Sequence, residues 1–134
     1  MKSILAIAAM GLCLAGCETI TPEQLAAQNA QASRTVECRG QEDCDVKWGR
    51  ATRWVLDNSE FKIRSQSETM IATMGPLPND PTPAFTITKI ALGQGAYEFD
   101  FRGGCDNMFG CVPSMTASRA SFVNAVMDGV STGR

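Results

Sequence analysis

The sequence predicts a small α+β domain: an antiparallel sheet of about four strands, with a helix before it and a helix after it, held by two disulfides. Apolar residues recur at helical spacing over residues 43–58 and again over 114–130. Between these stretches apolar and polar residues alternate, as they do in half-buried strands. Because no helical stretch separates the strands, an antiparallel sheet with the helices on one face is the simplest architecture.

The composition limits the possible functions. The 134 residues allow one ordinary domain. The 12 Lys and Arg residues against 14 Asp and Glu give a net charge of −2, so the chain lacks the concentrated positive charge of nucleic-acid-binding proteins, and no nucleic-acid partner is expected. The absence of histidine excludes Ser–His–Asp and Cys–His catalysis and most zinc sites with an open catalytic position. We expect no metal and no cofactor.

The first seventeen residues carry a targeting pattern. Lys2 gives a positively charged start, and residues 4–14 form an apolar run without charge. That run is shorter than the roughly 20 residues that a membrane-spanning helix needs, and it is typical of a signal peptide. It ends in Leu14–Cys17 (LAGC). These four residues resemble the lipobox of bacterial lipoproteins, in which a Leu and two small residues precede a Cys. The resemblance covers only about the first eighteen residues.

The resemblance implies an anchor. In lipoproteins the Cys thiol receives a diacylglyceryl group and the signal peptide is cut just before it, so residues 1–16 would be removed and Cys17 would begin the mature chain. Two or three acyl chains hold a protein stably on a membrane that it does not span. Glu18 departs from the Asp that retains enterobacterial lipoproteins in the inner membrane, so the expected location is the periplasmic face of the outer membrane. The alternative is a plain secretory signal with an incidental cysteine.

Residues 17–37 are expected to form the lipidated N-terminus and a flexible tether, followed by the folded domain over 38–134. The segment is polar and lacks a sustained apolar stripe that would hold it against a core. Thr21, Pro22 and Glu23 would also suit the start of a loose helix, which is the alternative.

Four cysteines predict the two disulfides. Cys13 leaves with the signal peptide and Cys17 would take the lipid, so an even set in an oxidising compartment remains: Cys38, Cys44, Cys105 and Cys111. Both pairs have the spacing C-x5-C, which matches neither zinc knuckles nor the C-x-x-C of redox proteins. Three connectivities are possible. We favour the two local pairs because each closes a short polar loop rich in turn residues; crossed pairs are the alternative.

The first predicted helix covers residues 43–58, with Asp43 as its N-cap. One face of it carries Cys44, Trp48, Ala51 and Val55. Trp54 lies beside this face, where packing in the core or at its rim is the expected role and binding of a partner is the alternative. The last helix is expected to begin after Ser114 and to fray near Gly129.

The predicted strands lie between these helices. Residues 61–64 and 68–74 form a hairpin around 65–67, and four prolines within 76–83 mark an extended loop. Alternation resumes over 85–92 but changes phase, which predicts a β-bulge near Thr88 and Lys89. A three-residue turn at 93–95 then leads to the clearest strand, in which Tyr97, Phe99 and Phe101 face the core.

The proline-rich loop is the best candidate for a binding site. Loops on a rigid scaffold carry recognition, and prolines reduce the entropy lost on binding. A rigid crossover that protects a sheet edge is the alternative. The possible partner-binding residues are Pro76, Leu77, Pro78, Asn79, Asp80 and Pro81.

No catalytic residues are expected. Glu98 and Asp100 share one side of a strand, but Arg102 follows on a side predicted to face water, so they are interpreted as a solvated surface. The sequence therefore favours a non-enzymatic envelope module, anchored in lipid through Cys17, that binds another envelope protein or a polymer or has a structural role. The alternative is an inhibitor of a periplasmic or host hydrolase, such as a lysozyme or a protease.

Overall fold

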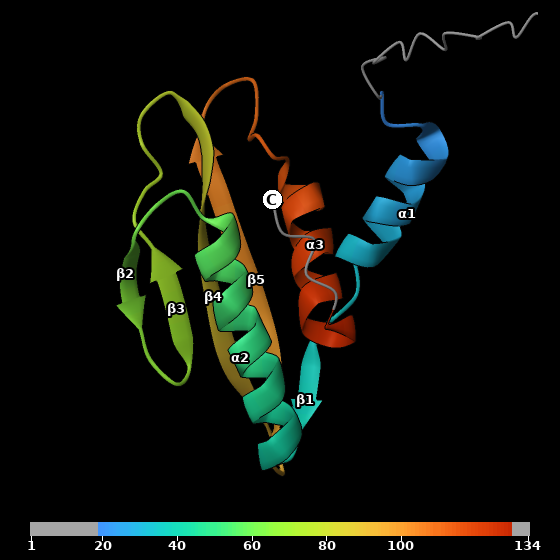
Figure 1. Ribbon diagram of the computed structural model, residues 1–134, viewed down its shortest axis with the longest axis vertical. Coiled ribbons are helices and arrows are strands. Elements are labelled where there is room, and N and C mark those ends of the chain that lie inside the picture. Colours follow the sequence, from blue (N-terminus) through green and yellow to red (C-terminus); the bar gives the residue numbers. More distant parts are fainter. Residues whose placement is uncertain (1–18, 130–134) are drawn as a thin grey trace, which may run out of the picture.

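The computed structural model describes residues 19–129 and has the expected α+β class (Figure 1). Its sheet is antiparallel throughout, with the strand order β1-β5-β4-β3-β2. The lipobox and Cys17 lie outside the described residues. The elements are α1 (Pro22–Ala32), β1 (Glu37–Arg39), α2 (Gln41–Asn58), β2 (Ile63–Gln66), β3 (Met70–Thr73), β4 (Asp80–Gly93), β5 (Ala96–Asp106) and α3 (Met115–Asp128).

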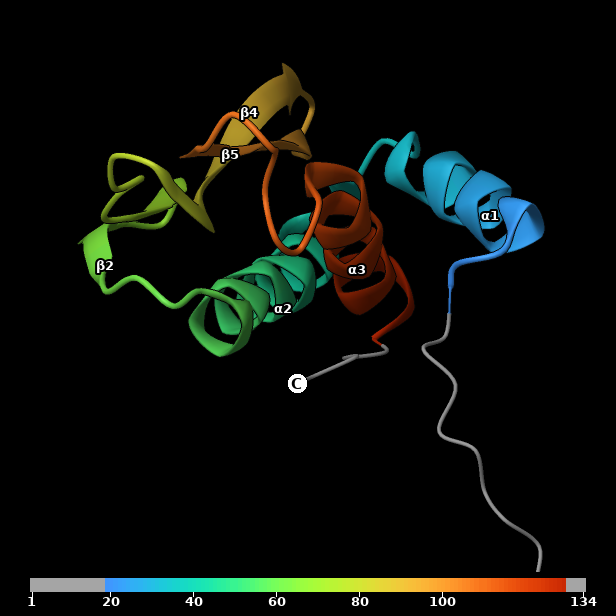
Figure 2. The same ribbon diagram turned by 90° about the horizontal axis from the view of Figure 1, so that it is seen from above.

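Two helices and the sheet form two layers. Seen from above, α2 and α3 lie on the same side of β4 and β5, and α1 lies beyond α3 (Figure 2). Trp54 of α2 is 2% exposed and stands at the centre of the core. Its ring makes edge contacts with Phe85 at 5.1 Å, Phe101 at 5.7 Å and Phe122 at 5.5 Å between centroids. The core role expected for Trp54 is confirmed.

Helix α2 begins two residues before the predicted start. Gly40 is its N-cap, with a φ of +78° that favours glycine. Asp43 therefore lies inside the first turn, where its carboxylate accepts a hydrogen bond from the Arg39 backbone N–H at 2.9 Å. At the other end of the chain, Ser114 caps α3 as predicted, since its hydroxyl accepts from the Ala117 N–H at 3.1 Å.

The flexible tether expected before the domain is wrong for Pro22–Ala32, which form helix α1 with Thr21 as its N-cap, the alternative considered for this segment. Thr21 and Gln24 make a reciprocal capping box, which satisfies N–H groups at the start of the helix. Polar contacts with α3, and not an apolar stripe, hold the C-terminal end of α1. The Arg119 guanidinium donates to the Ala32 carbonyl at 2.5 Å, and the Gln31 side chain donates to Asn124. A search for apolar periodicity misses a helix held in this way.

The proline-rich loop is shorter than predicted, because Pro81 and Pro83 lie inside β4. The pairing of β4 with β5 jumps from Asp80–Asp106 to Ala84–Gly104, so the prolines occupy an irregular stretch. Proline cannot donate a ladder hydrogen bond, and strand irregularities are where it is tolerated. The expectation that these prolines exclude a strand is therefore wrong from Asp80 onward.

The β-bulge expected near Thr88 and Lys89 is also wrong. Residues 84–91 pair with β5 in one continuous register, and the shift comes later, between Ala91 and Gly93. Lys89 thus stays on the core side of the sheet, where its ammonium lies 4.8 Å from the centre of the Tyr97 ring and 5.9 Å from that of Trp48. An ammonium group is attracted to the face of an aromatic ring, so a lysine can occupy a position on the core side of the strand. The alternation of apolar and polar residues therefore changes at Lys89 without a bulge.

Both disulfides have the favoured local pairing, Cys38–Cys44 and Cys105–Cys111. The first joins β1 to the first turn of α2, and the second closes the loop that follows β5. A disulfide stabilises a fold mainly by removing conformational entropy from the unfolded chain. Short loops such as these remove little of it, so each bridge is expected to contribute only about 2–3 kcal/mol.

The two disulfides predict the result of thiol labelling. In oxidised protein unfolded in denaturant, we expect none of these four cysteines to react with an alkylating reagent, because their thiols are already bonded to each other. After reduction all four should react, as counted by mass spectrometry of the intact chain. Reaction of two of them before reduction would show that one bridge is missing.

Candidate functional site

The candidate binding loop does not stand alone in the structure. The second cysteine loop, residues 105–113, lies against residues 77–81 at the upper end of the molecule in Figure 1. The Val112 N–H donates to the Pro81 carbonyl at 2.9 Å, and the Asn107 amide donates to the Asn79 carbonyl at 3.1 Å. We call residues 74–79 and 107–114 together the two-loop tip.

The two-loop tip exposes large apolar side chains. The exposed fractions are 92% for Phe109, 89% for Met108, 70% for Val112 and 52% for Leu77. Folded chains rarely expose several such side chains side by side unless the patch binds something. Neither run of the tip, MGPLPN or NMFGCVPS, contains a charged residue. The tip is therefore an apolar surface without charged side chains of its own, bordered at its base by Asp80 and the exposed Asp106.

The tip is held by its own contacts. The Cys105–Cys111 disulfide closes the second loop, and within it the Phe109 N–H donates to the Asn107 side chain at 2.9 Å. At the base of the first loop, the hydroxyl and the backbone N–H of Thr82 donate hydrogen bonds to the Asp80 carboxylate. These bonds lower the pKa of Asp80. These contacts pre-organise the exposed side chains, which reduces the entropy lost when a partner binds.

Of the predicted loop residues, the structure places Pro76, Leu77, Pro78 and Asn79 in the tip, and Asp80 and Pro81 at its base in β4. Sequence reasoning missed Met108, Phe109 and Val112, which contribute the most exposed apolar surface. The sequence signal that could have indicated them was the uncharged run at 107–110, which places a phenylalanine between Cys105 and Cys111. Which loop lies beside it depends on the strand pairing.

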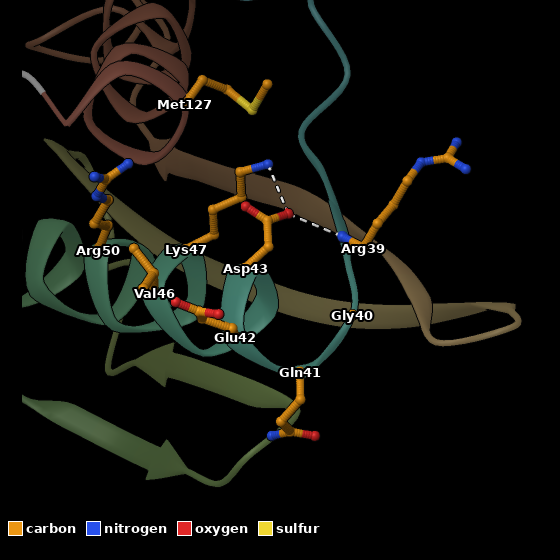
Figure 3. A pocket seen from close by; sticks show the side chains of 9 residues that line it. All are labelled: Arg39, Gly40, Gln41, Glu42, Asp43, Val46, Lys47, Arg50 and Met127. Atoms are coloured by element: carbon orange, nitrogen blue, oxygen red, sulfur yellow. Dashed lines mark hydrogen bonds and ion pairs between the residues drawn. The ribbon is translucent and has the colours of Figure 1, made fainter.

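A second hollow lies at the opposite end of the molecule, where α2 begins (Figure 3). It is an open cleft of about 750 Å³, lined by Arg39, Gly40, Gln41, Glu42, Asp43, Val46, Lys47, Arg50 and Met127. The polar groups at its centre already bind one another: the Lys47 ammonium donates to the Asp43 carboxylate at 3.0 Å and to the Glu37 carbonyl at 2.8 Å. The cleft is polar, and its central charges have structural partners.

Asp43 has a lowered pKa because the Arg39 N–H and the Lys47 ammonium stabilise its carboxylate. A carboxylate whose pKa is lower in the folded state stabilises the fold above its unfolded pKa, and this stabilisation is lost as the pH falls through the folded value. We expect Asp43→Asn to lower the urea midpoint at pH 7 and to have little effect at a pH well below the ordinary value of 3.8. An equal effect at both pH values would contradict the assigned contacts.

A smaller apolar pocket of about 340 Å³ lies under the tip, between α2, α3 and residues Val112 and Pro113. Trp54 forms part of its wall, and the Trp54 indole N–H donates to the Ser121 hydroxyl at 3.0 Å. Ser118 also lines it, with a buried hydroxyl that has no hydrogen-bond partner among residues 19–129. The pocket adds apolar surface behind the tip.

The carboxylates considered for catalysis lie on the strand face away from the helices. Asp100 pairs with Arg102 at 2.6 Å, and Glu98 is half-buried beside them. Across residues 19–129 no group of three or more Cys, Asp or Glu side chains is arranged to hold a metal ion. Within the same range, no helix has the length and apolar character needed to cross a bilayer.

Comparison of the chain with protein-family models, with curated proteins and with solved structures finds no match.

Proposed function

We propose that this protein is a lipid-anchored protein of the bacterial envelope that acts by binding or structural support and not by catalysis. The lipobox at Leu14–Cys17 supports an anchor at Cys17, and Glu18 favours the periplasmic face of the outer membrane. The two structural disulfides agree with an oxidising compartment, where such bonds persist.

The two-loop tip is the observation that carries the binding role. It combines an exposed Phe109 and Met108 with a disulfide-closed backbone. A few residues carry most of the binding energy at interfaces, and aromatic residues and methionine are enriched there. We therefore propose the tip as the surface that meets another component of the envelope.

Crosslinking in cells tests this proposal. A photoreactive phenylalanine analogue placed at Phe109 should crosslink the protein to an envelope component. The matched control is the same analogue at Leu92, which is also exposed but lies near the turn at the other end of the sheet. Crosslinks of equal yield from both positions, or none from Phe109, would contradict a binding role for the tip.

An inhibitor of a hydrolase is the second candidate. The specific observation in its favour is the disulfide-closed loop that exposes Met108 and Phe109, because a constrained loop of this kind can enter an enzyme cleft. Assays of lysozyme and of periplasmic proteases with the purified protein test it. Inhibition that is lost in Phe109→Ala would support it, and full enzyme activity at saturating protein would contradict it.

A further inference from the structure

We propose that the two-loop tip docks on a lipid surface, and that this surface is the same leaflet in which Cys17 is anchored. The inference rests on the proposed lipid anchor and names the partner of the proposed binding surface. Its evidence is the place of the tip relative to the start of the described chain, together with the chemistry of the tip.

The tip and the first described residues lie at the same end of the molecule. In Figure 1 helix α1 begins at the upper end and runs downward, and the loops after β3 and β5 reach the same upper end. In Figure 2, seen from that end, α1 lies to one side of α3 and the loop after β5 to the other. Thr19, the first residue that the structure describes, comes only two residues after Cys17.

The short connection restricts where the membrane can be. Two residues span at most about 7 Å when fully extended. An acylated Cys17 would therefore hold the start of α1 close to the lipid headgroups. Ile20, near this start, is itself 62% exposed. Because the two-loop tip projects from the same end, a membrane that receives the anchor also meets Phe109 and Met108.

The side chains of the tip suit a lipid interface. Charged groups are costly to bury in a bilayer. The tip contains none between Met74 and Asn79 or between Asn107 and Ser114; the carboxylates next to it in the chain, Asp80 and Asp106, lie opposite each other at its base. Phe109 and Met108 project apolar surface that lipid can remove from water. A protein partner would not require this surface to lie level with the anchor.

The backbone of the tip also suits insertion, because polar main-chain groups need partners where water is scarce. The Gly110 N–H donates to the Asn107 carbonyl at 3.2 Å, and the Val112 N–H donates to Pro81. The Phe109 N–H is bonded to the Asn107 side chain. Pro76, Pro78 and Pro113 have no N–H to satisfy. Three N–H groups of the second loop thus have hydrogen-bond partners in the tip or at its base, and the prolines of the tip need none.

Docking of the tip would orient the domain. With the anchor and the tip both on the membrane, the long axis of the molecule in Figure 1 would stand away from the lipid. The cleft at the start of α2 and the turn between β4 and β5 would then face away from the membrane.

A tryptophan placed in the tip tests the proposal. The lipidated mature protein carrying Phe109→Trp is reconstituted in vesicles of phosphatidylethanolamine and phosphatidylglycerol, with and without bromine on the acyl chains. Bromine quenches only nearby indoles. Trp54 belongs to the core and Trp48 packs against it. These two residues provide the background emission. The matched control is Leu92→Trp, at the opposite end of the sheet.

We expect brominated lipid to remove most of the emission that Phe109→Trp adds to the wild-type signal, and to leave that of Leu92→Trp unchanged. If both variants float with the vesicles but are quenched equally, the anchor stands and docking of the tip is overturned. Crosslinks in cells from Phe109 to a protein, without quenching in vesicles, would assign the tip to a protein partner and also overturn it. A wild-type protein that carries no lipid and does not float would overturn the anchor, and this inference with it.

Discussion

Trp54→Ala is expected to lower the free energy of unfolding by about 3–5 kcal/mol, which is the usual cost of truncating a large aromatic side chain in a packed core. The Trp54 ring touches Phe85 of β4, Phe101 of β5 and Phe122 of α3, so its removal opens a cavity where both layers meet. Small domains have only about 5–15 kcal/mol in total. The measurement is the urea midpoint of the purified variant at neutral pH.

Leu56→Ala is the matched control for this prediction. Leu56 lies two residues further along α2 but is 52% exposed. Exposed substitutions usually change stability by no more than about 0.5 kcal/mol. If the two variants lost similar stability, the face of α2 assigned to the core would be wrong.

Cys17→Ser is expected to abolish attachment of lipid to the chain. Serine has no thiol to receive the diacylglyceryl group, so the variant should either be released in soluble form or accumulate with its signal peptide uncut. Release follows from losing the acyl chains that would hold the mature protein, and the uncut form would follow from the loss of the cysteine before which the peptide is cut. Cell fractionation with metabolic labelling by a radioactive or clickable fatty acid measures the lipid and the location together.

Cys13→Ser is the matched control, because Cys13 lies in the same signal segment but precedes the lipobox. It should incorporate lipid and sediment with membranes like the wild type. The lipoprotein interpretation would be contradicted if the Cys17→Ser variant were processed, labelled with lipid and sedimented in the same way as the wild type.

Local patterns in the sequence were enough to predict much of the fold. The helical spacing of Cys44, Ala51 and Val55 predicts their buried face of α2, and the structure confirms it. Short spacing and turn residues favour the local disulfides, since both properties are visible within seven residues. The three-residue strand β1 was not predicted, because so short a segment has no detectable period.

Contacts between distant segments could not be predicted in the same way. The two-loop tip depends on the Val112–Pro81 and Asn107–Asn79 hydrogen bonds, whose partners are about thirty residues apart. The position of Lys89 depends on aromatic rings from another helix and another strand. Such pairs follow from the register of β4 on β5, which alternation alone does not specify. The sequence therefore pointed to one loop of the tip but not to its neighbour.

Helix α1 sets how far the domain can travel from its proposed anchor. Its 11 residues rise about 16 Å as a helix, whereas the same residues fully extended would reach about 36–40 Å. The Thr21–Gln24 capping box and the Arg119 contact with Ala32 favour the shorter form. A partner beyond that radius could be reached only after α1 unfolds and leaves α3. With Cys17 acylated as proposed, α1 would restrict the domain to components that come close to the membrane.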